Sequence, residues 1–188
     1  KLPELIKYLK SLEATKSIFL VTNGQEPDMI QKLQDEDALP TQLYLSTNAA
    51  DYESFIKINK PKYDDSWERW NRTLAMLKNL DTRTVLRITL IRNYNDQKEM
   101  IPAFADMFRK ASPHFIEIKS YMHIGRSTNR LEHENMLEMH EVKKFSEQIA
   151  KQSKIFSIMD ESLVSRISIL QNNERFIDRW IPTYANTN

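Results

Sequence analysis

The sequence predicts an α/β fold built on parallel strands, and two observations lead to this prediction. Four runs of apolar and β-branched residues have the length and composition of strands in a parallel sheet. Segments with helical spacing separate these runs, an order typical of parallel strands joined by right-handed crossovers.

The first half of the chain provides two of these strands. Apolar residues between positions 2 and 12 mark one face of a helix. Residues 17–21 then predict a fully buried strand, which ends at the turn formed by residues 22–24. Residues 28–33 predict a helix, and residues 42–46 predict the next strand.

The second half continues the alternation. A helical region begins near Asp51 and is interrupted at Pro61. The remaining elements are predicted in this order: a helix over 67–80 with capping candidates at 64–66, a strand over 84–91, a helix over 98–110, a strand over 115–121, an amphipathic helix around 142–149, and two short strands over 155–159 and 166–170.

An open doubly wound sheet and part of a barrel both satisfy this order. Both folds place their chemistry in the loops at the carboxyl ends of the strands. Those loops are residues 22–24, 46–48, 92–96 and 121–135. The last loop is long and contains Gly125, which is typical of a binding loop.

The composition fits one globular domain of 188 residues, 40% of them hydrophobic and 28% charged. No apolar stretch approaches the roughly 20 residues of a membrane-spanning helix, so no membrane partner is expected. The first residues do not have the pattern of a secretory leader and the chain contains no cysteine, so we expect the cytoplasm rather than a disulfide-stapled secreted domain. Because Lys1 enters a helical pattern directly, further sequence is expected before it.

Positive charge is concentrated in the middle of the chain. The net charge is only +1, but residues 83–130 contain nine lysine and arginine residues against four acids. This asymmetry favours an anionic partner, although lysine-rich helix surfaces are often only solvated.

The sequence excludes several familiar sites. Two glycines are too few for a dinucleotide fingerprint or a phosphate loop. The four histidines do not recur at the spacing of metal ligands, so no metal site made by this chain alone is expected.

Polar residues follow the predicted strands where a ligand would bind. Thr22 and Asn23 offer a hydroxyl and an amide to an amino or carboxylate group. Ser46 and Asn48 offer the same groups to ribose hydroxyls.

Arg87 is a cation within an apolar strand, and Thr89 lies two residues on, on the same face. A buried arginine needs an anion, which is either a ligand or a structural carboxylate. Both interpretations stay open, as does the interpretation of residues 22–24 as only a turn.

The long loop combines rings with cations, a mixture that suits RNA. The alternative is a solvated surface loop with incidental charge. The residues concerned are Tyr121, His123, Arg126, Asn129 and Arg130.

Six segments resemble the tRNA 4-demethylwyosine synthase family, in a form closer to its archaeal members. They are residues 19–24 (FLVTNG), 39–46 (LPTQLYLS), 83–90 (RTVLRITL), 115–125 (FIEIKSYMHIG), 129–131 (NRL) and 134–136 (ENM). The resemblance covers nearly the whole chain. It implies a partial parallel (βα) barrel of the radical S-adenosylmethionine type, in which this chain is a C-terminal fragment with the last four of six strands. Residues 1–125 would belong to the core, and residues 126–188 would be a C-terminal extension packed on it.

The resemblance also implies a reaction. N1-methylguanosine next to the anticodon of phenylalanine tRNA is condensed with pyruvate to form 4-demethylwyosine, using S-adenosylmethionine, iron-sulfur clusters and an electron donor. The family holds its clusters on cysteines that would all lie before Lys1. This chain alone is therefore expected to be catalytically silent.

The predicted contacts divide into two groups. Those with S-adenosylmethionine are assigned to Thr22, Asn23, Ser46, Asn48, Arg87 and Thr89, and those with tRNA to Tyr121, His123, Arg126 and Arg130. The sequence departs from the family where Asn48 replaces an aspartate and where Lys60 replaces an arginine. A cluster-free RNA-binding module and a radical enzyme acting on another RNA base remain alternatives.

Overall fold

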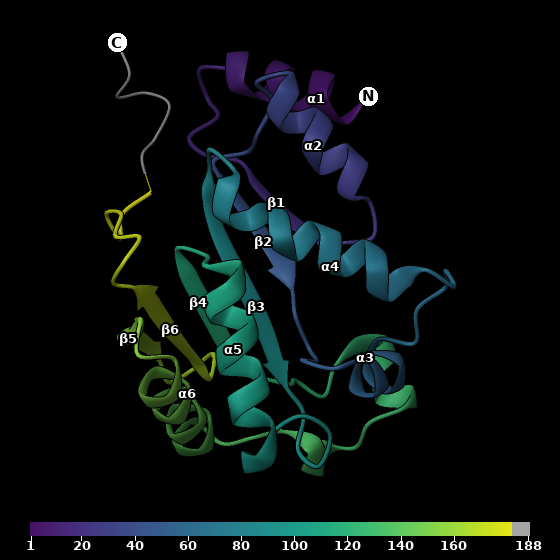
Figure 1. Cartoon of the computed structure of the whole chain (residues 1–188), viewed down its shortest axis with the longest axis vertical. Helices are drawn as coiled ribbons and strands as arrows, with labels where there is room; N and C mark the ends of the chain where they lie inside the picture. The colour runs from purple at the N-terminus through teal and green to yellow at the C-terminus, as the bar shows by residue number, and fades with distance from the viewer. Residues whose placement is uncertain (182–188) are drawn as a thin grey trace.

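The computed structural model describes residues 1–181 and contains one six-stranded sheet (Figure 1). The strands lie in the order β1-β2-β3-β4-β6-β5. The first four pair in parallel, whereas β6 is antiparallel to both β4 and β5. The strands are β1 (Phe19–Thr22), β2 (Gln42–Ser46), β3 (Arg83–Leu90), β4 (Phe115–Ser120), β5 (Phe156–Ser162) and β6 (Ile167–Asn172).

Helices separate the parallel strands, which confirms the predicted α/β alternation. The α-helices are α1 (Leu2–Ser11), α2 (Pro27–Asp35), α3 (Tyr52–Asn59), α4 (Ser66–Met76), α5 (Ile101–Ala111) and α6 (Met139–Ser153). Short 3₁₀ helices cover Leu77–Asn79, Lys98–Met100, Gly125–Asn129 and His133–Asn135. None of the helices in residues 1–181 has the length and hydrophobicity that a membrane crossing requires.

The two faces of the sheet differ. Helices α2, α4, α5 and α6 lie over one face (Figure 1). On β3, Leu86, Ile88 and Leu90 are fully buried on this covered face. Arg87 and Thr89 alternate with them on the other face and are partly exposed. The carboxyl ends of the parallel strands point downward in Figure 1, toward α3 and the loop that follows β4.

Strand β1 is not fully buried, so the prediction of its burial was wrong. Phe19 and Val21 are each 51% exposed. The reason is that β1 is an edge of the sheet and pairs only with β2 in the described part of the chain. Burial depends on a neighbouring strand, which apolar composition does not reveal.

Two predicted helices are less regular than their spacing suggested. The helix expected over 67–80 is α4 followed by a 3₁₀ turn. The helix expected over 98–110 starts as a 3₁₀ turn and becomes α-helical at Ile101. Pro102 lies in the first turn of α5, where its missing N–H leaves no helical hydrogen bond unmade.

Candidate functional site

Two neighbouring cavities open at the carboxyl ends of the parallel strands. The first, of about 360 Å³, is lined by Asn23, Ser46 and Asn48, together with α3 and the segment after it. The second, of about 350 Å³, is lined by Asn48, Thr89 and Lys119, together with the loop after β4. Asn48 lines both cavities, so the two adjoin just beyond the end of β2.

The structure brings four of the six predicted cofactor-binding residues to these cavities: Asn23, Ser46, Asn48 and Thr89. The other two have different surroundings. Thr22 pairs in register with Leu45, on the helix-covered face of the sheet. Arg87 lies beside Ser46 in the register, but its guanidinium contacts a residue of β4.

That residue is Glu117. The Arg87 Nε donates to Glu117 Oε1 at 2.7 Å, and the same guanidinium lies 4.4 Å from the centre of the Tyr44 ring. The Glu117 side chain is only 8% exposed, against 29% for Arg87. The anion that Arg87 requires is therefore present within the chain, as one of the two interpretations expected.

The turn after β1 is fixed by its own hydrogen bonds and by α4. The Thr22 hydroxyl accepts from the Gly24 amide at 3.0 Å, and Thr73 of α4 donates to the Gly24 carbonyl at 2.8 Å. Gly24 has φ +78°, and a Cβ there would lie 2.8 Å from Leu45 and 2.9 Å from Trp70. Only glycine fits without displacement, and the turn holds Asn23 at the first cavity.

Asn95 was not identified from the sequence, although it joins the ends of β2 and β3. It is completely buried, and its Oδ1 accepts from the Ile91 amide at 2.7 Å. Its Nδ2 donates to the Asn48 and Thr89 carbonyls, both at 2.9 Å. Asn48 Oδ1 in turn accepts from the Thr89 amide at 3.1 Å. The only signal in the sequence was the position of Asn95 in a strand-end loop.

The long loop does not present all its predicted RNA contacts at the surface. Tyr121 is only 5% exposed, and its hydroxyl lies 3.2 Å from His123 Nδ1. Its buried ring is not available for base stacking, which corrects the expectation of an exposed aromatic platform. His123 is partly exposed, whereas Arg126 and Arg130 are exposed.

Arg92 fixes the end of this loop through hydrogen bonds, a role that the sequence did not reveal. Its guanidinium makes two 2.6 Å hydrogen bonds to the Glu141 carboxylate of α6. It also donates to the carbonyls of Glu134 and Met136, both at 3.0 Å. The hydrogen bonds from Arg92 hold the pKa of Glu141 below its usual value, so the pair stays ionised near neutral pH.

Positive charge gathers around the two cavities. Lys60 and Lys62 line the first cavity, and Lys119 and Arg130 line the second. No lining residue of either cavity is acidic. Within residues 1–181, none of these four cations forms an ion pair. This end of the sheet can therefore attract an anion.

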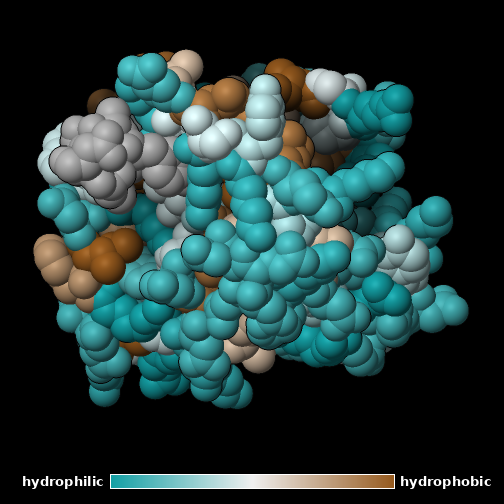
Figure 2. Space-filling model, turned by 90° about the horizontal axis from the view of Figure 1, so that it is seen from above, coloured by the Kyte–Doolittle hydropathy of each residue, from teal (hydrophilic) through white to brown (hydrophobic). Residues whose placement is uncertain are grey.

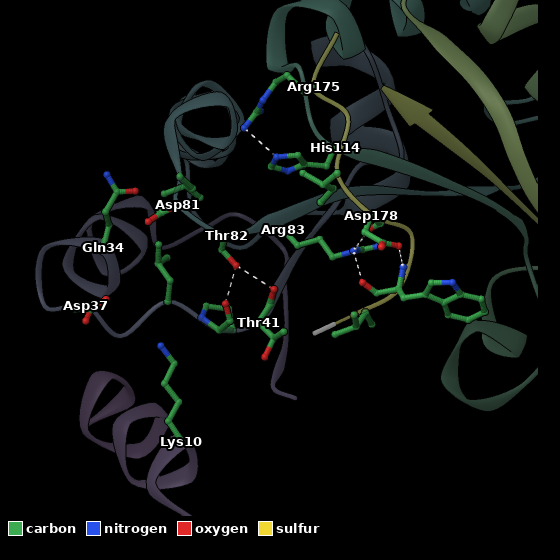
Figure 3. A pocket seen from close by; sticks show the side chains of 16 residues that line it. Lys10, Gln34, Asp37, Thr41, Asp81, Thr82, Arg83, His114, Arg175 and Asp178 are labelled. Carbon is green, nitrogen blue, oxygen red and sulfur yellow. Dashed lines mark hydrogen bonds between the residues drawn. The ribbon is translucent and has the colours of Figure 1, made fainter. Parts of the chain in front are cut away.

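A cavity of about 980 Å³ lies at the opposite end, at the amino ends of the strands (Figure 3). Arg83 donates there to the carbonyls of Asp178 and Arg179, at 2.7 and 2.6 Å. Lys10, Arg83 and Arg175 line this cavity beside three acids, Asp37, Asp81 and Asp178. Figure 2 looks onto this end of the molecule and shows a mostly hydrophilic surface with hydrophobic patches near its borders.

His114 is part of the amino-end network. The Thr84 amide donates to its Nδ1 at 3.1 Å, and Arg175 lies 3.3 Å from its Nε2. Burial, followed by the positive charges of Arg175 and Arg83, lowers the pKa of His114 to about 4. The ring is therefore neutral near physiological pH.

No candidate metal site emerges in the described residues, which contain no group of three or more His, Asp or Glu side chains suited to hold an ion. The whole chain lacks cysteine, so it contributes no thiolate.

Comparison with known sequences identifies related proteins. The family described as "Wyosine base formation" matches residues 110–172. The S-adenosyl-L-methionine-dependent tRNA 4-demethylwyosine synthase of Methanocaldococcus jannaschii is 40% identical over 179 residues, covering 94% of this chain and 53% of the relative. The synthase of Pyrococcus abyssi is 38% identical over 156 residues, covering 83% of this chain and 45% of the relative. The chain thus spans about half the length of these relatives.

Solved structures agree with the sequence relatives. The crystal structure of archaeal TYW1 has a TM-score of 0.73 at 35% identity, covering 93% of this chain and 52% of that one. TYW1 with a lysine-pyruvate adduct bound gives 0.74 at 40% identity, covering 85% and 48%. The radical enzyme coproporphyrinogen III oxidase of Escherichia coli gives 0.56 at 14% identity, covering 92% and 39%, which shows a shared fold alone. These likenesses confirm the predicted fold class.

Proposed function

The chain belongs to the tRNA 4-demethylwyosine synthase family, and from this premise we propose that the protein containing it makes 4-demethylwyosine on tRNA. The proposed reaction condenses N1-methylguanosine, next to the anticodon of phenylalanine tRNA, with pyruvate. The structural observation that carries the proposal is the convergence of Asn23, Ser46 and Asn48 on one cavity at the strand ends. The carboxyl edge of parallel strands is where folds of this class bind their ligands.

The first cavity fits S-adenosylmethionine. Its volume of about 360 Å³ lies within the usual range for small-molecule sites. Phe55, Pro61 and Tyr63 provide apolar wall for an adenine ring, and Asn23, Ser46 and Asn48 provide polar groups for the ribose and amino acid parts. When bound, this cofactor supplies the radical chemistry together with an iron-sulfur cluster. The residues of this chain would orient the cofactor and exclude water.

An iron-sulfur cluster does not fit the residues of this chain. Thiolates are the usual ligands of such clusters, and the chain contains no cysteine. Cluster ligands in the complete protein would therefore come from outside these 188 residues, as would the contact with an electron donor.

The second cavity, with Lys119 and Arg130 in its lining, suits the two anionic substrates, pyruvate and tRNA. A relative has been solved with a lysine-pyruvate adduct bound, which supports pyruvate as the carbon donor. His123, Arg126 and Arg130 lie on the loop beside this cavity and would contact tRNA, while buried Tyr121 would position His123. A role in tRNA modification is consistent with the cytoplasmic location that we propose.

We further propose that residues 126–188 form an extension packed on the core of residues 1–125. Two contacts between these segments support the packing. Strand β6 continues the sheet by pairing with β4, and Arg92 of the core binds Glu141 of α6. Residues 182–188 lie outside the described part of the chain.

The proposed function is tested with the full-length protein and tRNA from a strain that lacks the synthase. Mass spectrometry should detect the tricyclic base after incubation with S-adenosylmethionine, pyruvate and a reductant. Ser46→Ala should weaken S-adenosylmethionine binding roughly three- to tenfold in calorimetry, because one hydrogen bond is lost. Ser157→Ala, an exposed change in β5, is the matched control. Absence of the product with a cluster-loaded protein would refute the proposal.

A further inference from the structure

A third, smaller cavity lies between the end of α3 and the long loop. Its volume is about 60 Å³, which is room for a few water molecules or one small anion. Lys57 and Lys60 line it from the α3 side, and Arg130 and Leu131 line it from the loop side. Cations far apart in the sequence thus line one cavity.

The surroundings of these cations make an anion favourable. None of the seven residues that line the cavity is acidic, and within residues 1–181 Lys57, Lys60 and Arg130 form no ion pair. Three like charges repel one another, and an anion between them would offset that repulsion. Ile58 and Ile91 form an apolar wall, next to which the attraction for an anion is stronger than in open water.

The location connects this cavity to the two already described. Lys60 also lines the first cavity, and Arg130 also lines the second. An anion held between Lys60 and Arg130 therefore sits where the proposed cofactor site and the proposed substrate site meet.

We propose that Lys57, Lys60 and Arg130 bind one phosphate of the RNA backbone and so fix the position of the target nucleotide. This inference rests on the proposed function and adds two lysines that the sequence did not assign to RNA. The cationic surface extends beyond the small cavity to Lys62 and Arg126, which are exposed. A free phosphate needs only the cavity, whereas an RNA strand uses this wider surface.

The experiment measures tRNA binding to the full-length protein by fluorescence anisotropy over a series of salt concentrations. Lys60→Gln should weaken binding roughly three- to tenfold at low salt and reduce the slope of log K against log salt by about one. Lys57→Gln and Arg130→Gln should act in the same direction. Lys60→Arg keeps the charge and should bind like the unsubstituted protein.

Lys110→Gln is the matched control. It removes the same charge from an exposed lysine in the last turn of α5, at the opposite end of the sheet. If Lys60→Gln and Arg130→Gln bind tRNA as tightly as Lys110→Gln does, with the same salt slope, the phosphate site is refuted. The same conclusion follows if inorganic phosphate binds and is weakened by these changes while tRNA binding is not.

This test is independent of catalysis. Product formation with unaltered tRNA affinity in the variants would overturn the phosphate site and leave the synthase activity standing. If the variants bind tRNA more weakly but the unsubstituted, cluster-loaded protein forms no product, the phosphate site stands and the synthase activity is refuted.

Discussion

The two ends of the sheet differ in how their charged groups are satisfied. At the carboxyl end, Lys60, Lys119 and Arg130 line cavities that contain no acid. At the amino end, three acids line the same cavity as the cations, and Arg83 donates to backbone carbonyls. Both ends have cavities and arginines, so neither feature identifies a site.

The difference suggests a criterion: cations with partners inside the chain are structural, and the cations without an ion pair within residues 1–181 are the ones that we propose to bind ligands. Arg83 and Arg175 donate to backbone carbonyls and tie the segment after β6 to the sheet, although the buried Arg83 Nε has no hydrogen-bond partner among the described residues. The unpaired cations at the carboxyl end have no such role in the described residues. Cavity volume alone would favour the amino end, because the cavity there is more than twice as large as either cavity at the strand tips.

The largest loss of stability is expected at the carboxyl end, from the substitution Asn95→Ala. The change leaves the Ile91 amide and the Asn48 and Thr89 carbonyls without a partner in a buried place. The free energy of unfolding in urea should fall by about 3 kcal/mol. Asn79→Ala, at an exposed position near the amino end, should change it by less than about 0.5 kcal/mol. Equal effects of the two changes would contradict the bridging role of Asn95.

At the amino end, His114 should make the free energy of unfolding depend on pH. Its pKa is about 4 in the folded protein, below the ordinary 6.5, so the unfolded chain takes up the proton first as the pH falls. Stability due to this residue is complete above pH 6.5 and is lost toward pH 4. We expect a loss of about 2 kcal/mol, less than the full shift would give because the ring is not fully enclosed.

Urea unfolding at pH 7 and pH 4.5 measures this effect. His114→Asn should remove most of the pH dependence, since an amide oxygen can still accept from Thr84 but does not titrate. His140→Asn, at an exposed position on α6, should leave the dependence in place. If His114→Asn keeps the full dependence, the amino-end network is not its source.

The smallest loss of stability is expected when the ion pair of Arg87 and Glu117, which lies between the two ends, is broken. Glu117→Gln should lower the free energy of unfolding by about 1 kcal/mol, because the partly exposed Arg87 is then solvated in place of its partner. Arg87→Gln combined with Glu117→Gln should cost less than the sum of the two single changes. Glu161→Gln, which breaks the more exposed pair with Lys143, is the control. Additive effects would mean that Arg87 is held by something other than Glu117.

The sequence predicted the parts of the fold that depend on local pattern. The alternation of strands and helices was read from residue spacing, and the loops at the strand ends were located correctly around Asn23, Ser46 and Asn48. These predictions succeeded because the period of apolar residues reflects which face of each element is buried.

What the sequence did not predict depends on contacts between distant residues. Glu117 as the partner of Arg87, and Lys57 as a neighbour of Arg130, become visible only when strands and loops are placed together. Tyr121 looked like a surface ring because its loop is polar, yet its amide donates to the Leu90 carbonyl and its side chain is buried. Residue type in a loop therefore says little about exposure when the loop folds back on the sheet.

Because β6 pairs with β4 in the antiparallel direction, the parallel part of the sheet has a free edge only at β1 in the described residues. On the β4 side, antiparallel β6 already pairs with β4, so a further parallel strand cannot hydrogen-bond to β4 there. On the β1 side, backbone groups and the half-exposed Phe19 and Val21 remain open to a further strand. A further strand that pairs directly with the parallel part of the sheet would therefore join at β1.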